Sequence, residues 1–232
     1  MRLDKFLKEV GLGTRTEVKK IIKQKRVEVN NQVVTDDGFY VDENRDLIKV
    51  DGAIQTYLKY VYLMLNKPQG YVTARIDNLY PTVLDLINDY QHLELFPVGR
   101  LDLDTEGLLL ITNNGGLAHR LLQPKYHVDK TYYLTTDVPL SFDDMMILEK
   151  GVLLDNQMTK PAKIRPVADG YYLTISEGRF HQVKRMINMV NKNVSYLKRV
   201  AFGPLTLDEK LKPGEYRLLS ADEIRLIEEN KK

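Results

Sequence analysis

Three carboxylates in the middle of this 232-residue chain have the types and spacing that could perform acid–base or nucleophilic chemistry. They are Asp102, Asp104 and Glu106. Arg100 precedes them, and the apolar run Gly107–Thr112 follows them directly. Charges beside a buried strand are costly unless they are paired or used. The segment is therefore a solvated turn, a calcium loop, or a catalytic carboxylate beside an orienting arginine.

The calcium interpretation fails on spacing. A calcium loop that opens at Asp102 needs a bidentate Glu at its twelfth position, and that position holds Asn113. The chain has no Cys, which excludes disulfides, thiolate–metal sites and a Cys nucleophile. None of its four histidines has a second His at ligand spacing, so we expect no metal. Without a GxGxxG or Walker A motif, we also expect no cofactor.

Composition places the chain among globular proteins. Apolar residues make up 43% and charged residues 28% of the sequence. The length is compatible with a small module beside a larger domain. No uncharged run approaches the roughly 20 residues that span a bilayer, and the first residues are too charged for a signal peptide. We expect a cytoplasmic monomer with no membrane association.

Basic residues cluster in two places although the net charge is only +2. Residues 1–29 contain nine Lys or Arg against four Asp or Glu. Residues 177–200 contain one acidic residue, Glu177, and six basic residues, which are Arg179, Lys184, Arg185, Lys192, Lys198 and Arg199. Two such patches are typical of a protein that binds a polyanion, with a solvated surface as the alternative.

The N-terminal part is predicted to be a small separate module. Residues 3–11 form an amphipathic helix, and a T-x-x-E capping box at Thr14 opens a second helix that ends near Lys25. Strands 27–29 and 32–34 follow, joined by a tight turn. A domain boundary near residues 57–59 divides the chain into domains 1–59 and 60–232. Four basic residues form one stripe of the second helix and its end: Arg15, Lys19, Lys23 and Arg26.

The remainder alternates strands with helices, which predicts an α+β fold with a mixed sheet. Strands are expected at 60–65, 107–112, 131–135, 152–154, 162–167, 171–176 and 194–202. Helices are expected at 82–87, from Ser141 to about Lys150, at 179–190, and after Ser220.

Residues 99–115, GRLDLDTEGLLLITNNG, resemble the signature G-R-L-D-x-x-T-x-G-L-L-L-x-T-N-[DN]-G of the RsuA-type pseudouridine synthases. Four further segments resemble motifs of this family, in the family's order. These are NKPQG at 66–70, DKTY at 129–132 (the family has Glu in the first position), EGRFHQVKRM at 177–186 and PGEYR at 213–217. The first 50 or so residues resemble the S4 RNA-binding module. The resemblance implies an S4-type module followed by a catalytic domain with a mixed, mostly antiparallel sheet flanked by helices.

The same resemblance implies a site-specific uridine isomerase acting on ribosomal RNA. Asp102 would be the essential carboxylate, with first attack on the base or on the sugar left open. Tyr132 would stack on an extruded uracil and relay a proton, although a core aromatic is the alternative. Lys184 would be the cation that keeps Asp102 ionised, with Arg185 as its neighbouring candidate and phosphate contacts as the alternative. His181 is expected to be a structural, hydrogen-bonded residue.

RNA contacts are expected from seven basic side chains: Arg15, Lys19, Lys23, Arg26, Arg100, Arg179 and Arg185. Arg100 could instead pair with Asp104 or Glu106. Segments 80–84 and 159–162 resemble the small-subunit branch of the family, which favours 16S rRNA, free or in a partly assembled particle. The competing hypotheses are a large-subunit (23S) rRNA enzyme, a non-catalytic rRNA-binding assembly factor, and an N-glycosidase.

Overall fold

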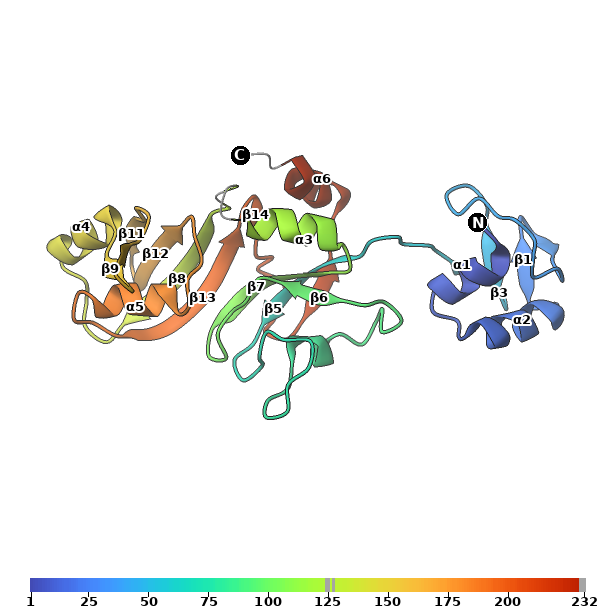
Figure 1. Cartoon of the computed structure of the whole chain (residues 1–232), viewed down its shortest axis with the longest axis horizontal. Helices are drawn as coiled ribbons and strands as arrows, with labels where there is room; N and C mark the ends of the chain where they lie inside the picture. Colours follow the sequence, from blue (N-terminus) through green and yellow to red (C-terminus); the bar gives the residue numbers. More distant parts are fainter. Residues whose placement is uncertain (124–125, 127, 230–232) are drawn as a thin grey trace. The chain divides into compact units, whose positions relative to one another are not determined.

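The computed structural model describes residues 1–123, 126 and 128–229 and shows two compact units (Figure 1). The N-terminal unit comprises Met1–Tyr60 together with Asn88–Leu95, and the second unit comprises Val61–Ile87 and Phe96–Lys232. No helix in the described part of the chain is long and apolar enough to cross a membrane.

The N-terminal unit packs two helices on a small antiparallel sheet. Helices α1 (Leu3–Glu9) and α2 (Arg15–Lys23) share one apolar core with the sheet, whose strand order is β2-β1-β3-β4. These strands are β1 (Val27–Val29), β2 (Gln32–Val33), β3 (Ile48–Val50) and β4 (Ala53–Gln55). The predicted capping box is present, because the Glu17 amide donates to the Thr14 hydroxyl and the Thr14 amide donates to the Glu17 carboxylate.

The second unit is built on a nine-stranded sheet with the order β11-β12-β8-β13-β7-β5-β15, to which β6 and β14 are added. The strands are β5 (Tyr62–Lys67), β6 (Phe96–Val98), β7 (Glu106–Thr112), β8 (Lys130–Thr136), β11 (Lys163–Val167), β12 (Gly170–Ile175), β13 (Val194–Phe202), β14 (Leu205–Thr206) and β15 (Tyr216–Leu218). All their pairings are antiparallel except the parallel pair β7–β13. The expected mixed, mostly antiparallel sheet is thus confirmed.

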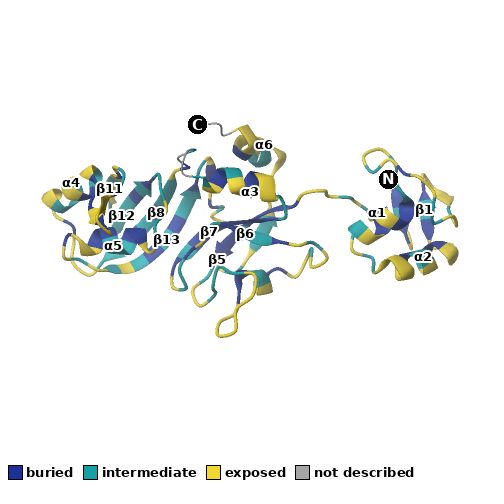
Figure 2. Ribbon diagram, in the orientation of Figure 1, coloured by how far each residue is buried: buried dark blue, intermediate teal, exposed yellow. Residues whose placement is uncertain are grey.

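Helices and a hairpin surround this sheet. They are η1 (a 3-10 turn, Val83–Leu86), α3 (Gly115–Leu122), α4 (Phe142–Lys150), α5 (Gln182–Asn188), α6 (Ala221–Glu229) and the hairpin β9–β10 (Leu153–Leu154, Gln157–Met158). Buried side chains of β5 and β7 join those of α3 and α6 in one apolar cluster. Figure 2 shows the buried strands against exposed outer helix faces. The sequence patterns did not predict α3.

Gly107 permits the parallel junction between β7 and β13. It lies opposite Arg199 in the register, and its φ of +104° is one that side-chain-bearing residues rarely adopt. A Cβ atom at this position would lie 2.2 Å from the carbonyl oxygen of Arg199. The two halves of the sheet can therefore meet only because this residue has no side chain.

Gly107→Ala is expected to lower the free energy of unfolding by about 3 kcal/mol, from backbone strain and from the clash with β13. Gly214→Ala is the matched control, since Gly214 also has a positive φ but open space around its Cβ position. Urea unfolding of both variants separates the clash from the strain. Equal losses of stability would show that the close approach costs nothing.

Candidate active site

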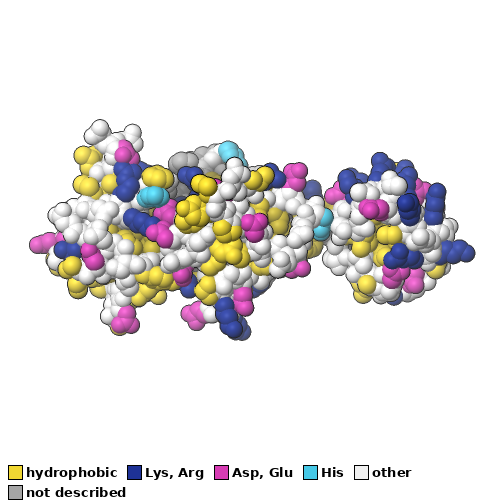
Figure 3. Space-filling view, turned by 90° about the horizontal axis from the view of Figure 1, so that it is seen from below, with side chains coloured by type: hydrophobic (Ala, Val, Ile, Leu, Met, Phe, Trp, Pro, Cys, Tyr) yellow, Lys and Arg dark blue, Asp and Glu magenta, His cyan; other side chains and the backbone are white. Residues whose placement is uncertain are grey.

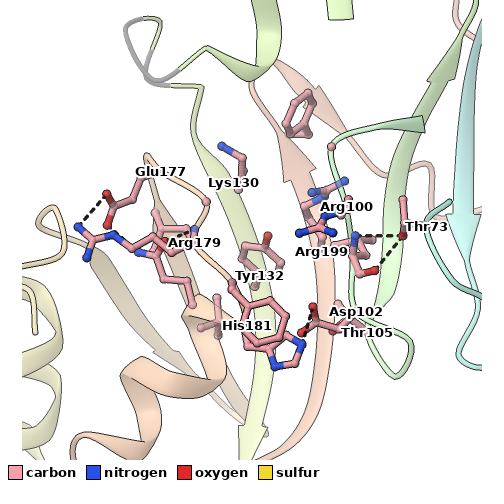
Figure 4. A pocket seen from close by; sticks show the side chains of 18 of the residues that line it. Thr73, Arg100, Asp102, Thr105, Lys130, Tyr132, Glu177, Arg179, His181 and Arg199 are labelled. Atoms are coloured by element: carbon pink, nitrogen blue, oxygen red, sulfur yellow. Dashed lines mark hydrogen bonds and ion pairs between the residues drawn. The ribbon is translucent and has the colours of Figure 1, made fainter. Parts of the chain in front are cut away.

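A cavity of about 570 Å³ in the second unit is lined by all three residues that the sequence indicates for catalysis, Asp102, Tyr132 and Lys184. Its walls come from the loop before β7, from strands β8 and β13, and from the segment that leads into α5 (Figure 4). The volume lies within the range of small-ligand sites. The fold thus joins residues that are up to 82 positions apart in the chain.

Asp102 lies between two basic side chains. Its Oδ2 atom is 3.5 Å from Nζ of Lys184, and its Oδ1 atom is 3.5 Å from Nε2 of His181. The Asp102 side chain is 27% exposed, so it is accessible to a ligand but partly shielded from water. The carboxylate is therefore held in place from both sides, as a reacting group in a cleft must be.

Lys184 is shared between two carboxylates. Its Nζ atom is 2.5 Å from Oδ1 of Asp104, closer than it is to Asp102. Partial burial acts to raise the pKa of Asp104, but the hydrogen bond and charge of Lys184 outweigh burial and lower it. The alternative cation, Arg185, forms an ion pair with Asp155 instead, with 2.6 Å between its Nη2 atom and Oδ1 of the aspartate. Of the two candidates, Lys184 is the one that reaches the carboxylate segment.

A buried lysine fixes the loop that carries Asp102. Nζ of Lys67, at the end of β5, donates to the backbone carbonyls of Asp102, Leu103 and Thr105 at 3.0, 3.3 and 2.9 Å, and to that of Pro68 at 3.0 Å. Burial lowers the pKa of Lys67 to about 8. The NKPQG motif contains Lys67, but the sequence gives this residue no role, because contacts across more than 30 residues have no local pattern.

The helix that carries Lys184 begins later than predicted, which places two aromatic rings at the cavity. His181 has a left-handed backbone (φ 49°), so α5 starts at Gln182 instead of Arg179. Phe180 is 67% exposed and stacks on the His181 ring with centroids 3.7 Å apart. His181 was expected to be structural, but its imidazole lies beside Asp102 (Figure 4).

The basic residues expected at the cavity differ in their freedom to bind RNA. Arg100 is exposed, lines the cavity, and has no ion-pair partner among the described residues. The Arg179 guanidinium donates to three carbonyls of the β9–β10 hairpin segment at 2.7 to 3.3 Å and thus anchors that hairpin. Arg185 is likewise bound to Asp155. Within the described part of the chain, Arg100 is therefore the free cation of the three.

Three of the four residues in the basic stripe of the N-terminal unit are ion-paired, and all four are at least partly exposed. Arg15, Lys19 and Arg26 contact Asp4, Asp37 and Asp51, respectively. Lys23 has no ion-pair partner in the part of the chain that is described. Figure 3 shows Lys and Arg side chains gathered on the visible face of this unit. RNA phosphates would have to compete with these aspartates for Arg15, Lys19 and Arg26. At Lys23 no carboxylate of the described residues would compete with them.

The double variant Lys19→Ala/Lys23→Ala is expected to weaken RNA binding and to reduce the slope of log K against log salt by about 1 to 2, because each phosphate contact releases roughly one counterion. Filter binding between low and physiological salt measures the slope. Lys150→Ala, which removes one exposed lysine from the second unit, controls for the loss of a surface charge outside α2. An unchanged slope would remove α2 from the RNA-binding surface.

The described residues contain no cluster of three His, Asp or Glu side chains that could hold a metal ion. Around Asp102, the cavity brings together one partly shielded carboxylate, the basic groups of Lys184 and His181, and the buried ring of Tyr132. Tyr132, on β8, is 8% exposed and reaches the cavity from the strand next to β13 (Figure 4).

Comparisons with known proteins show the family to which the chain belongs. Residues 61–189 match the family model described as RNA pseudouridylate synthase, and residues 1–47 match the S4 domain. An uncharacterized RNA pseudouridine synthase of Bacillus subtilis, YtzG, is 45% identical, with 99% of each chain covered. The ribosomal small subunit pseudouridine synthase A of Yersinia pestis is 42% identical (98% of each chain), and that of Escherichia coli is 40% identical (98% of this chain, 100% of the other).

A solved structure described as a crystal structure of pseudouridylate synthase superimposes with a TM-score of 0.70 at 38% identity, covering 98% of this chain and 99% of the other. The chain therefore belongs to the RNA pseudouridylate synthase family, with an N-terminal S4 domain, and it is an isomerase that acts on RNA. The family expected from the sequence motifs is confirmed.

Proposed function

We propose that this protein converts one uridine of small-subunit (16S) ribosomal RNA to pseudouridine, with Asp102 as the reacting carboxylate. The observation that carries the proposal is the placement of Asp102 in the cavity, 3.5 Å from both Lys184 and His181. The choice of the small subunit is supported by the names of the relatives from Yersinia pestis and Escherichia coli, which match over their full length.

The reaction rearranges a nucleotide without adding an atom. The bond between N1 of uracil and C1′ of ribose breaks, the base turns, and a bond forms between C5 and the same C1′. C5 loses its proton and N1 gains one, so product and substrate are isomers. Asp102 can assist as a nucleophile or by stabilising cationic character at the sugar, which is the chemistry that carboxylates supply in glycosidic bond cleavage.

The target base must leave its stack to reach Asp102. Tyr132 offers a ring against which a uracil can lie, and the exposed Phe180 ring, stacked on His181, can receive a neighbouring base at the cavity mouth. Arg100 is free to bind the phosphate that follows the flipped nucleotide. The S4 domain would hold the surrounding RNA through its basic stripe. We propose that the protein acts as a monomer in the cytoplasm, on free RNA or on a partly assembled particle.

The proposal is tested with purified protein and three substrates: a 16S transcript, a 23S transcript and early small-subunit particles. Carbodiimide modification followed by reverse transcription detects pseudouridine. Conversion of one uridine in 16S RNA, free or in particles, is expected. Conversion in 23S RNA alone would move the enzyme to the large subunit. Binding without conversion would favour an assembly factor, and strand scission at an abasic site would reveal an N-glycosidase.

A further inference from the structure

Arg199, on β13, is a charged side chain enclosed in the wall of the cavity. It is 1% exposed and the largest fully buried side chain of the described chain. Its Nε atom donates to the carbonyl of Leu108 at 2.8 Å, and its guanidinium lies 5.1 Å from the centre of the Phe202 ring. Nη2 has no hydrogen-bond partner among the described residues, and none of their carboxylates forms an ion pair with Arg199.

A guanidinium buried without a carboxylate is an expensive feature, because desolvating a charge costs several kcal/mol unless it is compensated. On the same face of β13, Leu197 is buried and apolar, so the position could accept an apolar residue. Burial lowers the pKa of Arg199, and only interactions with Tyr132 act against this effect. Besides the Leu108 carbonyl and the Phe202 ring, Tyr132 is thus the neighbouring side chain that favours the charged form of Arg199.

Arg199 and Tyr132 are direct partners across the β8–β13 pairing. Figure 4 shows their side chains next to each other in the cavity wall. A guanidinium has only donors, so where it meets a phenol the oxygen must accept and the O–H bond must point elsewhere. A hydrogen bond from Arg199 would therefore set the direction in which Tyr132, which lines the cavity, presents its hydroxyl group.

The same residue also joins the two sides of the cavity. The backbone of Arg199 lies against Gly107, five residues after Asp102, at the only parallel junction of the described sheet. Its side chain donates to the Leu108 carbonyl on β7, and the residue is paired with Tyr132 on β8. Arg199 thereby links the strand that follows the carboxylate to the strand that carries the aromatic ring.

We propose that Arg199 is a positioning residue of the isomerase, which orients the ring and hydroxyl group of Tyr132 relative to Asp102 without touching the RNA. This inference rests on the proposed function, since it gives Tyr132 a role in handling the flipped base. It predicts that loss of Arg199 slows the chemical step and leaves RNA binding intact.

The test is a double-mutant cycle in single-turnover conversion of the RNA substrate. Arg199→Met is expected to lower the rate at saturating enzyme by about 100-fold, within the range for a misplaced proton-transfer group, with little change in the half-saturating concentration. Arg199→Lys should recover part of this loss, because it restores the charge but not the planar fork. In a Tyr132→Phe background, adding Arg199→Met should lower the rate by less than about threefold further. The reason is that the effects of two coupled residues on the rate are not additive in free energy.

Lys198→Met is the matched control, because Lys198 is the preceding residue on β13 and faces the other side of the sheet. The inference would be overturned if the rate losses of the two single variants multiplied in the double variant. It would also be overturned if Arg199→Met weakened RNA binding but left the rate at saturating enzyme unchanged. If Arg199→Met does not fold, the same cycle with Arg199→Lys decides. If the wild-type protein converts no uridine, the proposed function itself fails; if it converts uridine and only the cycle disagrees, Arg199 alone loses its role.

Discussion

Asp102→Asn is expected to abolish conversion of uridine, with a loss of at least about 1,000-fold in the single-turnover rate, because the amide cannot act as a nucleophile or stabilise a cation. The change preserves the size of the side chain. Lys184 retains its partner Asp104 at 2.5 Å, so the wall of the cavity should stay in place. RNA binding is therefore expected to persist while catalysis is lost.

Asp104→Asn is the matched control for this result. Asp104 is mostly exposed and holds Lys184, so its loss should free the lysine and reduce the rate by about tenfold or less, as expected for a supporting ion pair. Carbodiimide-primed reverse-transcription stops measure both variants on one substrate. Full conversion by Asp102→Asn, or a larger defect in Asp104→Asn, would show that the reacting carboxylate has been misassigned.

Lys67→Met is expected to remove the anchor of the Asp102 loop. Three loop carbonyls would lose their donor inside the protein, which costs about 1 to 3 kcal/mol for each group left unsatisfied. Part of this loss is offset because the variant no longer buries the charge of the lysine. We expect a net destabilisation of about 3 kcal/mol and a rate loss that exceeds the unfolded fraction. Urea unfolding and the single-turnover rate below the melting range measure the two effects. Wild-type activity in a folded variant would refute the anchoring role.

The depressed pKa of Lys67, about 8, gives a pH test of the same contact. Above pH 8 the folded protein loses the ammonium that holds the loop, so activity should decline. Between pH 8 and the ordinary lysine pKa of 10.5, Lys67 has lost its proton in the folded protein but keeps it in the unfolded chain. The contribution of Lys67 to the free energy of unfolding therefore rises with pH in this range. Lys130 also has a pKa of about 8 in the same cavity, and the profile of Lys130→Met separates the two lysines.

Local sequence patterns predicted most of the elements but not the contacts between distant ones. The apolar run that became β7 and the capping boxes at Thr14, Ser141 and Ser220 are each visible within a few residues. Helix α3 was missed because its Asn-Asn-Gly-Gly start is also typical of a turn, although Asn114 in fact caps it. The late start of α5 depends on the left-handed backbone of His181, which no residue type at that position announces.

For the site as well, sequence motifs indicated the reacting residues but not the tertiary contacts that hold them. Motif resemblance indicated Asp102, Tyr132 and Lys184, and the fold brings them to one cavity. It did not indicate how Lys67 binds the loop, because that contact is tertiary. Arg199 was counted in a basic surface patch, yet strand alternation from the buried Leu197 places it inside, so a signal for its burial was present in the sequence.

The role of this protein in modifying 16S rRNA can be tested by mapping pseudouridine in ribosomal RNA from cells that lack the protein. One pseudouridine is expected to disappear from 16S rRNA, to return with the wild-type gene, and to stay absent with the Asp102→Asn variant. An unchanged 16S map, or restoration of the missing pseudouridine by Asp102→Asn, would contradict this expectation.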